Sequence, residues 1–189
     1  MTFAELHHQD TPLLIANVWD ATSALAAQQA GYQALGTSSA AIAAMLGYED
    51  GEAMSFDELL YIVTRIRSVS NLPLSVNIEA GFGSSAYEIA EHLKRLFQTG
   101  VVGINLEDSS VVNGVRRLDD ALTFSGVLKE IRTRLNARNH HLFLNIRTDT
   151  YLLNHEQALQ ETLFINPLPG RLKNRLPCVQ WLRQMVPTG

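Results

Sequence analysis

The chain has 189 residues, of which 46% are hydrophobic and 18% are charged, so it suits a single folded domain and excludes a disordered linker protein. Its net charge of −4 gives no reason to expect a nucleic-acid or anionic-membrane partner. The chain has one cysteine, no apolar run near the ~20 residues that cross a bilayer, and no secretory signal, so we expect a cytoplasmic protein without a membrane partner.

Short apolar runs alternate with helical patterns along the first 163 residues. Continuous apolar runs are typical of parallel strands buried on both faces, and apolar residues at helical spacing predict one-sided helices. In chain order, the pattern predicts a strand at 13–19, a helix at 20–31, a strand at 32–36, a small-residue segment at 37–44, a helix at 55–66, a strand at 72–78, a helix at 86–99, a strand at 101–106, a polar loop at 108–114, a helix at 119–136, a strand at 141–146 and a helix from 155. Ser55 and Glu58 have the spacing of a capping box at a helix start.

The composition changes abruptly near residue 163. Residues 164–189 contain four basic residues, no acidic residue and four of the six prolines. We therefore predict a domain over 1–163, followed by an unrelated basic, proline-rich tail over 164–189. A frameshifted or rearranged gene end explains such a tail, and a genuine short variant whose tail docks on a partner is the alternative.

Five strand-then-helix units without hairpin signals require parallel strands, because each helix is a crossover connection. An open doubly wound sheet and part of a barrel both satisfy this pattern. The first strand-to-helix turn lacks the G-x-G-x-x-G of a dinucleotide-binding sheet, and polar residues gather at the carboxyl end of every strand, which is the catalytic face of a barrel. The predicted fold class is α/β, of the (β/α)₈ TIM-barrel type, incomplete with about five βα units and an atypical C-terminal tail.

The polar residues at the strand ends have the chemistry of a metal and anion site. Asn77, Glu79 and Glu107 follow two of the strands and Arg147 ends another. Carboxylates that project together repel one another and are costly to bury, so such a cluster usually holds a cation. Oxygen ligands suit Mg²⁺, with Mn²⁺ as a substitute, and the fork of Arg147 suits a substrate carboxylate or phosphonate.

Each of these residues also has a structural interpretation. The acids, Asp50 included, could be solvated loop carboxylates, and Arg147 could be an ion-pair partner of Asp149 or Glu107. Ser38 and Ser39, which are placed to hold the same anion as Arg147, could equally be turn or helix-cap residues. The glycines at 81 and 83 favour a tight turn over phosphate binding.

Five segments, taken in order, resemble motifs of the isocitrate lyase/phosphoenolpyruvate mutase superfamily. They are NVWDA (17–21), GTSSAAIAAMLGYEDGE (36–52), NIEAGFG (77–83), GINLEDS (103–109) and LNIRTDTY (144–151), within about residues 10–163. The resemblance implies an enzyme that breaks or rearranges a C–C or P–C bond of a small 2-oxo or 2-hydroxy carboxylate. It also implies that Mg²⁺ and a guanidinium stabilise an enolate intermediate.

The resemblance also assigns roles to residues. It places Asp50, Asn77, Glu79 and Glu107 in the metal shell, Trp19, Ser38, Ser39 and Arg147 around the substrate, and Arg147 and Glu107 in catalysis. A homo-oligomer is compatible with it.

Two departures from the family pattern affect this assignment. Asn77 stands where the motif normally has Asp, which removes one negative charge and weakens metal binding. In place of the lyases' K-K/R-C-G-H loop the chain has SSVVNGVRRLDD, which argues against isocitrate or methylisocitrate cleavage by a cysteine and leaves the general acid/base unassigned. Two hypotheses therefore stand: an active lyase or mutase, or a C-terminally truncated, inactive relative that acts only by association.

Overall fold

The structure is a computed structural model that describes residues 2–165. Its strands are β1 (Ile15–Val18), β2 (Ala34–Thr37), β3 (Leu74–Asn77), β4 (Gly103–Glu107), β5 (Ser109–Val112), β6 (Val115–Leu118) and β7 (Phe143–Arg147). Its helices are α1 (Phe3–Leu6), α2 (Ala21–Gln29), α3 (Ser39–Leu46), α4 (Phe56–Arg67), α5 (Ala86–Gln98), α6 (Ala121–Ala137) and α7 (Ala158–Ile165). Residues 166–189 of the predicted tail, with Cys178, lie outside the described part.

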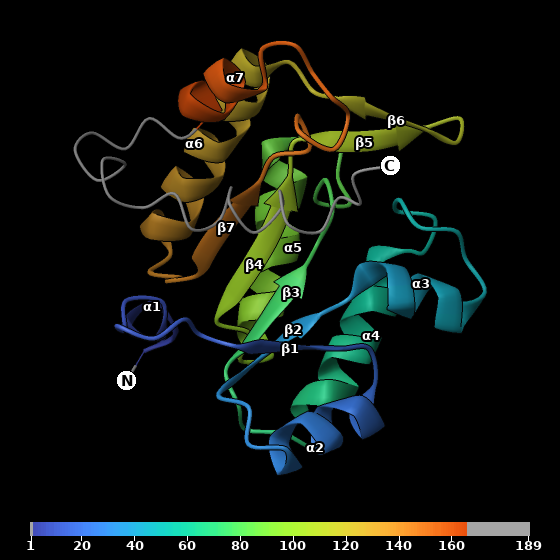
Figure 1. Cartoon of the computed structure of the whole chain (residues 1–189), viewed down its shortest axis with the longest axis vertical. Coiled ribbons are helices and arrows are strands. Elements are labelled where there is room, and N and C mark those ends of the chain that lie inside the picture. The colour runs from blue at the N-terminus through green and yellow to red at the C-terminus, as the bar shows by residue number, and fades with distance from the viewer. Residues whose placement is uncertain (1, 166–189) are drawn as a thin grey trace.

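The main sheet is parallel and its strands follow one another in the order β1-β2-β3-β4-β7. Because parallel crossovers are right-handed, strands that advance in one direction place their helices on one face of the sheet. Figure 1 shows α2, α4, α5 and α6 arranged along the outside of this curved sheet. This arrangement is that of a barrel wall, whereas a doubly wound sheet reverses its strand order.

The core lies between the inner strands and the covering helices. Along β2, β3 and β4 nearly every residue is buried, and each of these strands has a neighbouring strand on both sides. α4 and α5 each contribute an apolar stripe to the same cluster, including Leu59 and Leu93. The predicted capping box is present at α4, where the Ser55 amide donates to Glu58 Oε2 at 2.8 Å and the Glu58 amide donates to Ser55 Oγ at 3.3 Å.

The prediction of a polar loop at 108–114 is wrong. Here β5 and β6 form a two-stranded antiparallel hairpin in which Ser109 pairs with Leu118 and Val112 with Val115. Asn113 (φ 53°) and Gly114 (φ 75°) make the turn, and positive φ at both central residues is typical of a type I′ hairpin turn. The Asn-Gly pair between VV and VR was therefore a hairpin signal. Likewise, the segment predicted at 37–44 contains most of a helix, α3.

Across residues 2–165, none of the helices combines the length and apolarity that a bilayer-spanning segment requires.

The position of β4 in the interior of the sheet leads to a stability prediction. Ile104 is fully buried on β4 between β3 and β7, so Ile104→Ala would leave a cavity and lower the free energy of unfolding by about 2–5 kcal/mol. The control is Leu122→Ala, at an exposed position on α6, which should change it by less than about 0.5 kcal/mol. Urea denaturation followed by circular dichroism measures both, and equal losses would contradict the interior position of β4.

Candidate active site at the carboxyl ends of the strands

A cavity of about 250 Å³ opens at the carboxyl ends of the main-sheet strands. It is lined by Asn17, Thr37, Ser38, Ser39, Ala40, Asp50, Asn77, Glu79, Asn105, Glu107, Arg116 and Arg147. All but one of the predicted site residues therefore lie around a single space. The exception is Trp19, which is 42% exposed and is not among the lining residues.

The serines after β2 form the first wall of the cavity. Ser38 is the N-cap of α3, and its Oγ accepts a hydrogen bond from the amide of Ala41 at 3.3 Å. The helix-cap interpretation of Ser38 is thus realised, although the residue still lines the cavity. Because the first amides of a helix lack intrahelical acceptors, the start of α3 can contribute backbone N–H donors to an anion here.

Asn77 links the strands at the floor of the cavity. Its Nδ2 donates to Ser39 Oγ at 2.8 Å and to Glu107 Oε1 at 3.4 Å, and its Oδ1 accepts from the Glu79 amide at 3.1 Å. Its own backbone amide donates to Thr37 Oγ1 at 2.8 Å. An aspartate could not donate to Ser39 and Glu107 in this way, so the amide suits a site in which Glu107 is ionised.

Glu79 is a buried acid without a partner. Its residue is 3% exposed, and neither carboxylate oxygen has a hydrogen-bond partner. Burial raises the pKa of Glu79 to about 7; repulsion from Asp50, Glu52 and Glu107 adds to the rise, and the backbone amide of Glu52 partly opposes it. Its backbone lies in the left-handed region (φ 49°), which a non-glycine residue adopts at some cost and which occurs often at functional sites. An orphaned buried carboxylate is the expected state of a cation ligand without its cation.

Glu107 is the most heavily bonded acid of the site. It is 2% exposed, and Arg147 Nη1 donates to its Oε1 at 2.7 Å while Arg116 Nη1 donates to its Oε2 at 3.1 Å. Burial is the main influence on the pKa of Glu107 and raises it, and the charge of Arg147 partly opposes that rise. Glu107 thus holds the two guanidinium groups in fixed positions at the cavity.

Arg147 makes both of the ion pairs that its structural interpretation required. The first is the pair with Glu107, and in the second the Arg147 Nε lies 3.0 Å from Asp149 Oδ1. The Asp149 side chain is 1% exposed, and its Oδ1 accepts no hydrogen bond of suitable geometry. The Arg147 side chain remains 42% exposed and lines the cavity. These contacts use Nη1 and Nε, so they leave Nη2 to bind an anion, and the structural and substrate-binding interpretations are compatible.

Arg116, which the sequence analysis did not single out, is the second cation of the cavity. It lies on β6, and its Nη1 reaches Glu107, Ser109 and Asp149 at 3.1, 2.9 and 3.2 Å. The Asn-Gly turn signal could have identified it, because the hairpin folds its second strand back toward the end of β4.

The acids and amide around the cavity are the oxygen donors that a divalent ion would need. Among residues 2–165 no three Asp, Glu, His or Cys side chains converge into a ready-made metal site. Glu107 faces the arginines, and Asp50 Oδ2 lies 3.7 Å from Arg116 Nη2. Mg²⁺ usually keeps several waters and needs only one or two carboxylates. The unpartnered Glu79, with Asp50, Asn77 and Glu107 around the same cavity, fits such a hydrated ion.

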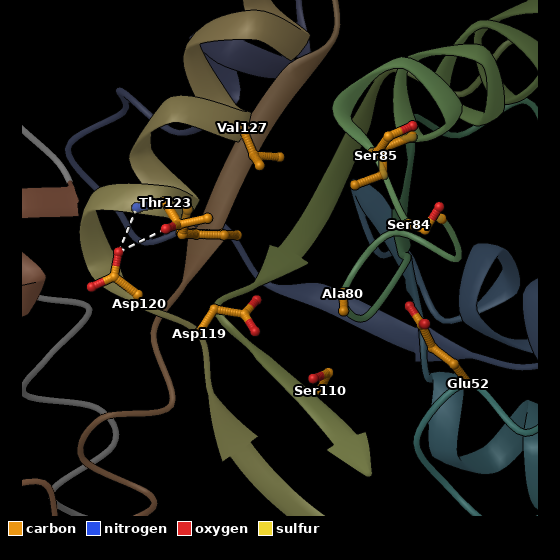
Figure 2. A pocket seen from close by; sticks show the side chains of 12 residues that line it. Glu52, Ala80, Ser84, Ser85, Ser110, Asp119, Asp120, Thr123 and Val127 are labelled. Atoms are coloured by element: carbon orange, nitrogen blue, oxygen red, sulfur yellow. Dashed lines mark hydrogen bonds between the residues drawn. The ribbon is translucent and has the colours of Figure 1, made fainter.

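A second cavity, of about 350 Å³, is lined by residues of the loop after α3, the start of α5, β5 and the start of α6. Figure 2 shows Glu52 and Asp119 on opposite sides of it, with Ser110 of β5 between them. Asp120 at its rim caps α6 through Thr123. Its lining residues include three acids and no Lys or Arg. An anionic substrate therefore suits the first cavity, which contains both arginines.

Comparisons with known proteins agree with the motifs. The family model for phosphoenolpyruvate phosphomutase matches residues 3–164. The uncharacterized protein Rv1998c of Mycobacterium tuberculosis is 31% identical over 163 residues, which are 86% of this chain and 58% of that protein. The 2-methylisocitrate lyase of Escherichia coli is 40% identical over 101 residues, which are 53% of this chain and 34% of the enzyme.

Among solved structures, a candidate phosphonomutase from Burkholderia cenocepacia superposes with a TM-score of 0.79 at 33% identity, covering 86% of this chain and 67% of that one. The predicted α/β class of the barrel type and the predicted resemblance are thereby confirmed. The chain spans less than two thirds of the length of these two curated relatives. Because the family model matches residues 3–164, which are most of this chain, the chain belongs to the phosphoenolpyruvate phosphomutase family.

Proposed function

We propose that this chain is a Mg²⁺-dependent enzyme of the lyase or mutase type, which cleaves or rearranges a C–C or P–C bond of a small 2-oxo or 2-hydroxy carboxylate through an enolate. The observation that carries the proposal is the buried, unpartnered carboxylate of Glu79, which lies in the same cavity as Asp50, Glu107 and Arg147. Family membership supports it, because named relatives are lyases and the matching model is that of a phosphomutase.

In this proposal the positively charged and N–H groups of the cavity bind the anionic substrate, and the acids bind the metal ion. Arg147 and the amides at the start of α3 bind and orient the carboxylate of the substrate, since a guanidinium and helix N-terminal donors both favour an anion. Glu107 holds Arg147 in place through the 2.7 Å hydrogen bond. Glu79, Asp50, Asn77 and Glu107 hold the divalent ion. When bound, that ion supplies positive charge next to the oxygen on which negative charge develops.

The structure of the β5–β6 segment narrows the reaction class. A hairpin occupies the place of the lyases' K-K/R-C-G-H loop, and its strands contain no cysteine. Cleavage that needs a cysteine acid–base on this loop is therefore disfavoured. A rearrangement, in which the group that leaves one atom of the substrate is captured by another atom of the same molecule, needs no such residue.

Binding of Mg²⁺ and oxalate, an enolate mimic, tests the proposed site. Mg²⁺ with oxalate should raise the melting temperature of the chain, because both bind the folded state, and Glu79→Gln should abolish the Mg²⁺-dependent part. Glu130→Gln, which removes an acid from the exposed face of α6, is the matched control and should respond like the unaltered chain. Differential scanning fluorimetry measures the shifts, and an unchanged response in Glu79→Gln would refute the metal assignment.

The role of Arg147 leads to a separate expectation. Arg147→Gln should weaken oxalate binding by about tenfold to a hundredfold in the presence of saturating Mg²⁺, because a hydrogen bond to a charged group contributes ~1.5–3 kcal/mol. Arg147→Lys keeps the charge but not the fork, so it should recover only part of the loss. Isothermal titration calorimetry gives the affinities. If oxalate binds equally to all three proteins, Arg147 has only its structural role.

Glu79 predicts a pH dependence of the metal-free chain. Its pKa rises from 4.5 to about 7 on folding, so the folded state binds more protons than the unfolded state between these values. Stability should fall as pH rises through this window, and the full penalty, up to about 3 kcal/mol, is present above pH ~7. With EDTA present, Glu79→Gln should match the unaltered chain near pH 4.5 and exceed it at pH 8 in urea denaturation. A constant difference at both pH values would contradict the shift.

Turnover distinguishes the proposal from the alternative of an inactive, association-only relative. The purified chain is incubated with Mg²⁺ and a panel that includes oxaloacetate, methylisocitrate, dimethylmalate-type acids and phosphonopyruvate, and products are detected by mass spectrometry. We expect consumption of at least one acid, which Glu79→Gln abolishes. Binding of Mg²⁺ and oxalate without any turnover would favour the association-only alternative.

A further inference from the structure

Arg116 is paired with two of the acids that the proposed cation needs, Asp50 and Glu107. Its Nη1 lies within hydrogen-bonding distance of Glu107 and Asp149, and its Nη2 is 3.7 Å from Asp50 Oδ2. The side chain is only 20% exposed. Its contacts are therefore largely screened from water, and the guanidinium acts as a fixed positive charge inside the acid cluster.

The carboxylate of Glu107 has little capacity left for a further partner. Its Oε1 accepts from Arg147 and Asn77, and its Oε2 accepts from Arg116. An ionised carboxylate offers about four acceptor positions, so most of them are used. A divalent ion that draws on Glu107 and Asp50 competes with Arg116 for these oxygens, and the two positive charges also repel each other.

The hairpin that carries Arg116 is joined to the loop after α3 at a second point. Gly51 (φ 109°) packs directly on Val111, so closely that a Cβ on Gly51 would lie 2.5 Å from the Val111 side chain. Val111 is the register partner of Arg116, and Asp50 precedes Gly51. Loop and hairpin therefore meet at the Asp50–Arg116 ion pair and at the Gly51–Val111 contact.

We propose that Arg116 is an internal cation that competes with the divalent ion for Asp50 and Glu107, so that ion binding releases the β5–β6 hairpin and the docked hairpin weakens ion binding. The inference rests on the proposed metal site. It assigns to Arg116 a positioning role, because Arg116 sets the position of the hairpin and the availability of the acids.

The test compares Mg²⁺ affinity in the full chain and in two variants. Arg116→Gln keeps a polar side chain and removes the charge, and it should bind Mg²⁺ at least about tenfold more tightly, since a unit charge near the ion is lost. Arg117→Gln is the matched control, because it makes the same charge change on the next residue of β6. That side chain points to the opposite face of the strand and is exposed, so the affinity should change by less than about twofold. Isothermal titration calorimetry with Mg²⁺ alone gives the constants.

Hydrogen exchange provides a readout that does not depend on activity. In the unaltered chain, saturating Mg²⁺ should speed amide exchange across residues 109–118, because the hairpin loses its anchor at Arg116. In Arg116→Gln, exchange should already be fast and Mg²⁺ should add little. If Mg²⁺ slows exchange of the hairpin in the unaltered chain, the ion orders the hairpin and the inference is wrong.

The outcomes separate this inference from the proposed function. If the unaltered chain binds Mg²⁺, Glu79→Gln does not, and Arg116→Gln binds no more tightly, only the inference falls. If neither the unaltered chain nor Arg116→Gln binds Mg²⁺, both fall. Should Arg116→Gln fail to melt cooperatively, the exchange measurement on the unaltered chain decides, and Arg116→Lys, which keeps the charge, should remain close to the unaltered affinity.

Discussion

The carboxylates of Glu79, Glu107 and Asp149 are buried at one end of a parallel sheet, where an ionised group without a partner is costly to maintain. Arg116 and Arg147 neutralise two of these acids, whereas Glu79 has no partner and its pKa rises to about 7. This imbalance is the source of the chemistry proposed for the cavity. A site with every acid paired would be a structural ion cluster, and the unpaired one leaves room for an external cation.

The topology of the sheet explains why these side chains meet. Consecutive parallel strands point the same way, so their carboxyl ends lie at one edge. The register of the paired strands then determines which residues lie side by side: Asn77 pairs with Asn105, and Glu107 pairs with Arg147. A shift of one residue in either pair would turn the side chains to the other face of the sheet, and the cavity would lose either its acid or its guanidinium.

Two features of this chain change the charge of the cavity in the same direction. Asn77 replaces the aspartate of the family motif and so removes a negative charge, and the hairpin adds the positive charge of Arg116. Both reduce the attraction of the cavity for a divalent ion. The amide of Asn77 in addition donates to Glu107, which already carries both guanidinium groups, so the acid most involved in ion pairing is also the one least available to a metal.

The strand-and-helix alternation, the barrel class and most of the predicted residues around the candidate cavity could be read from the sequence. Apolar periodicity identified the five main strands, and polar residues at their ends identified Glu79, Glu107 and Arg147, because both patterns depend on local chemistry and on the common direction of parallel strands. The failures have local causes as well. The Asn-Gly turn of the β5–β6 hairpin was overlooked because β5 and β6 are short and partly polar. Trp19 follows a strand but is not among the residues that line the cavity.

Tertiary structure alone decided how the charges are shared. Which acid remains unpaired depends on distances of a few ångströms between side chains that lie far apart in the sequence, such as Arg147 and Glu107. The pKa of Glu79 likewise depends on burial and on the approach of Asp50, Glu52 and Glu107. Residue types and spacing contain no such distances. The sequence by itself therefore determined which groups gather at the strand ends, and the packing of loop, hairpin and sheet decided which of them pair and which one is left for a ligand.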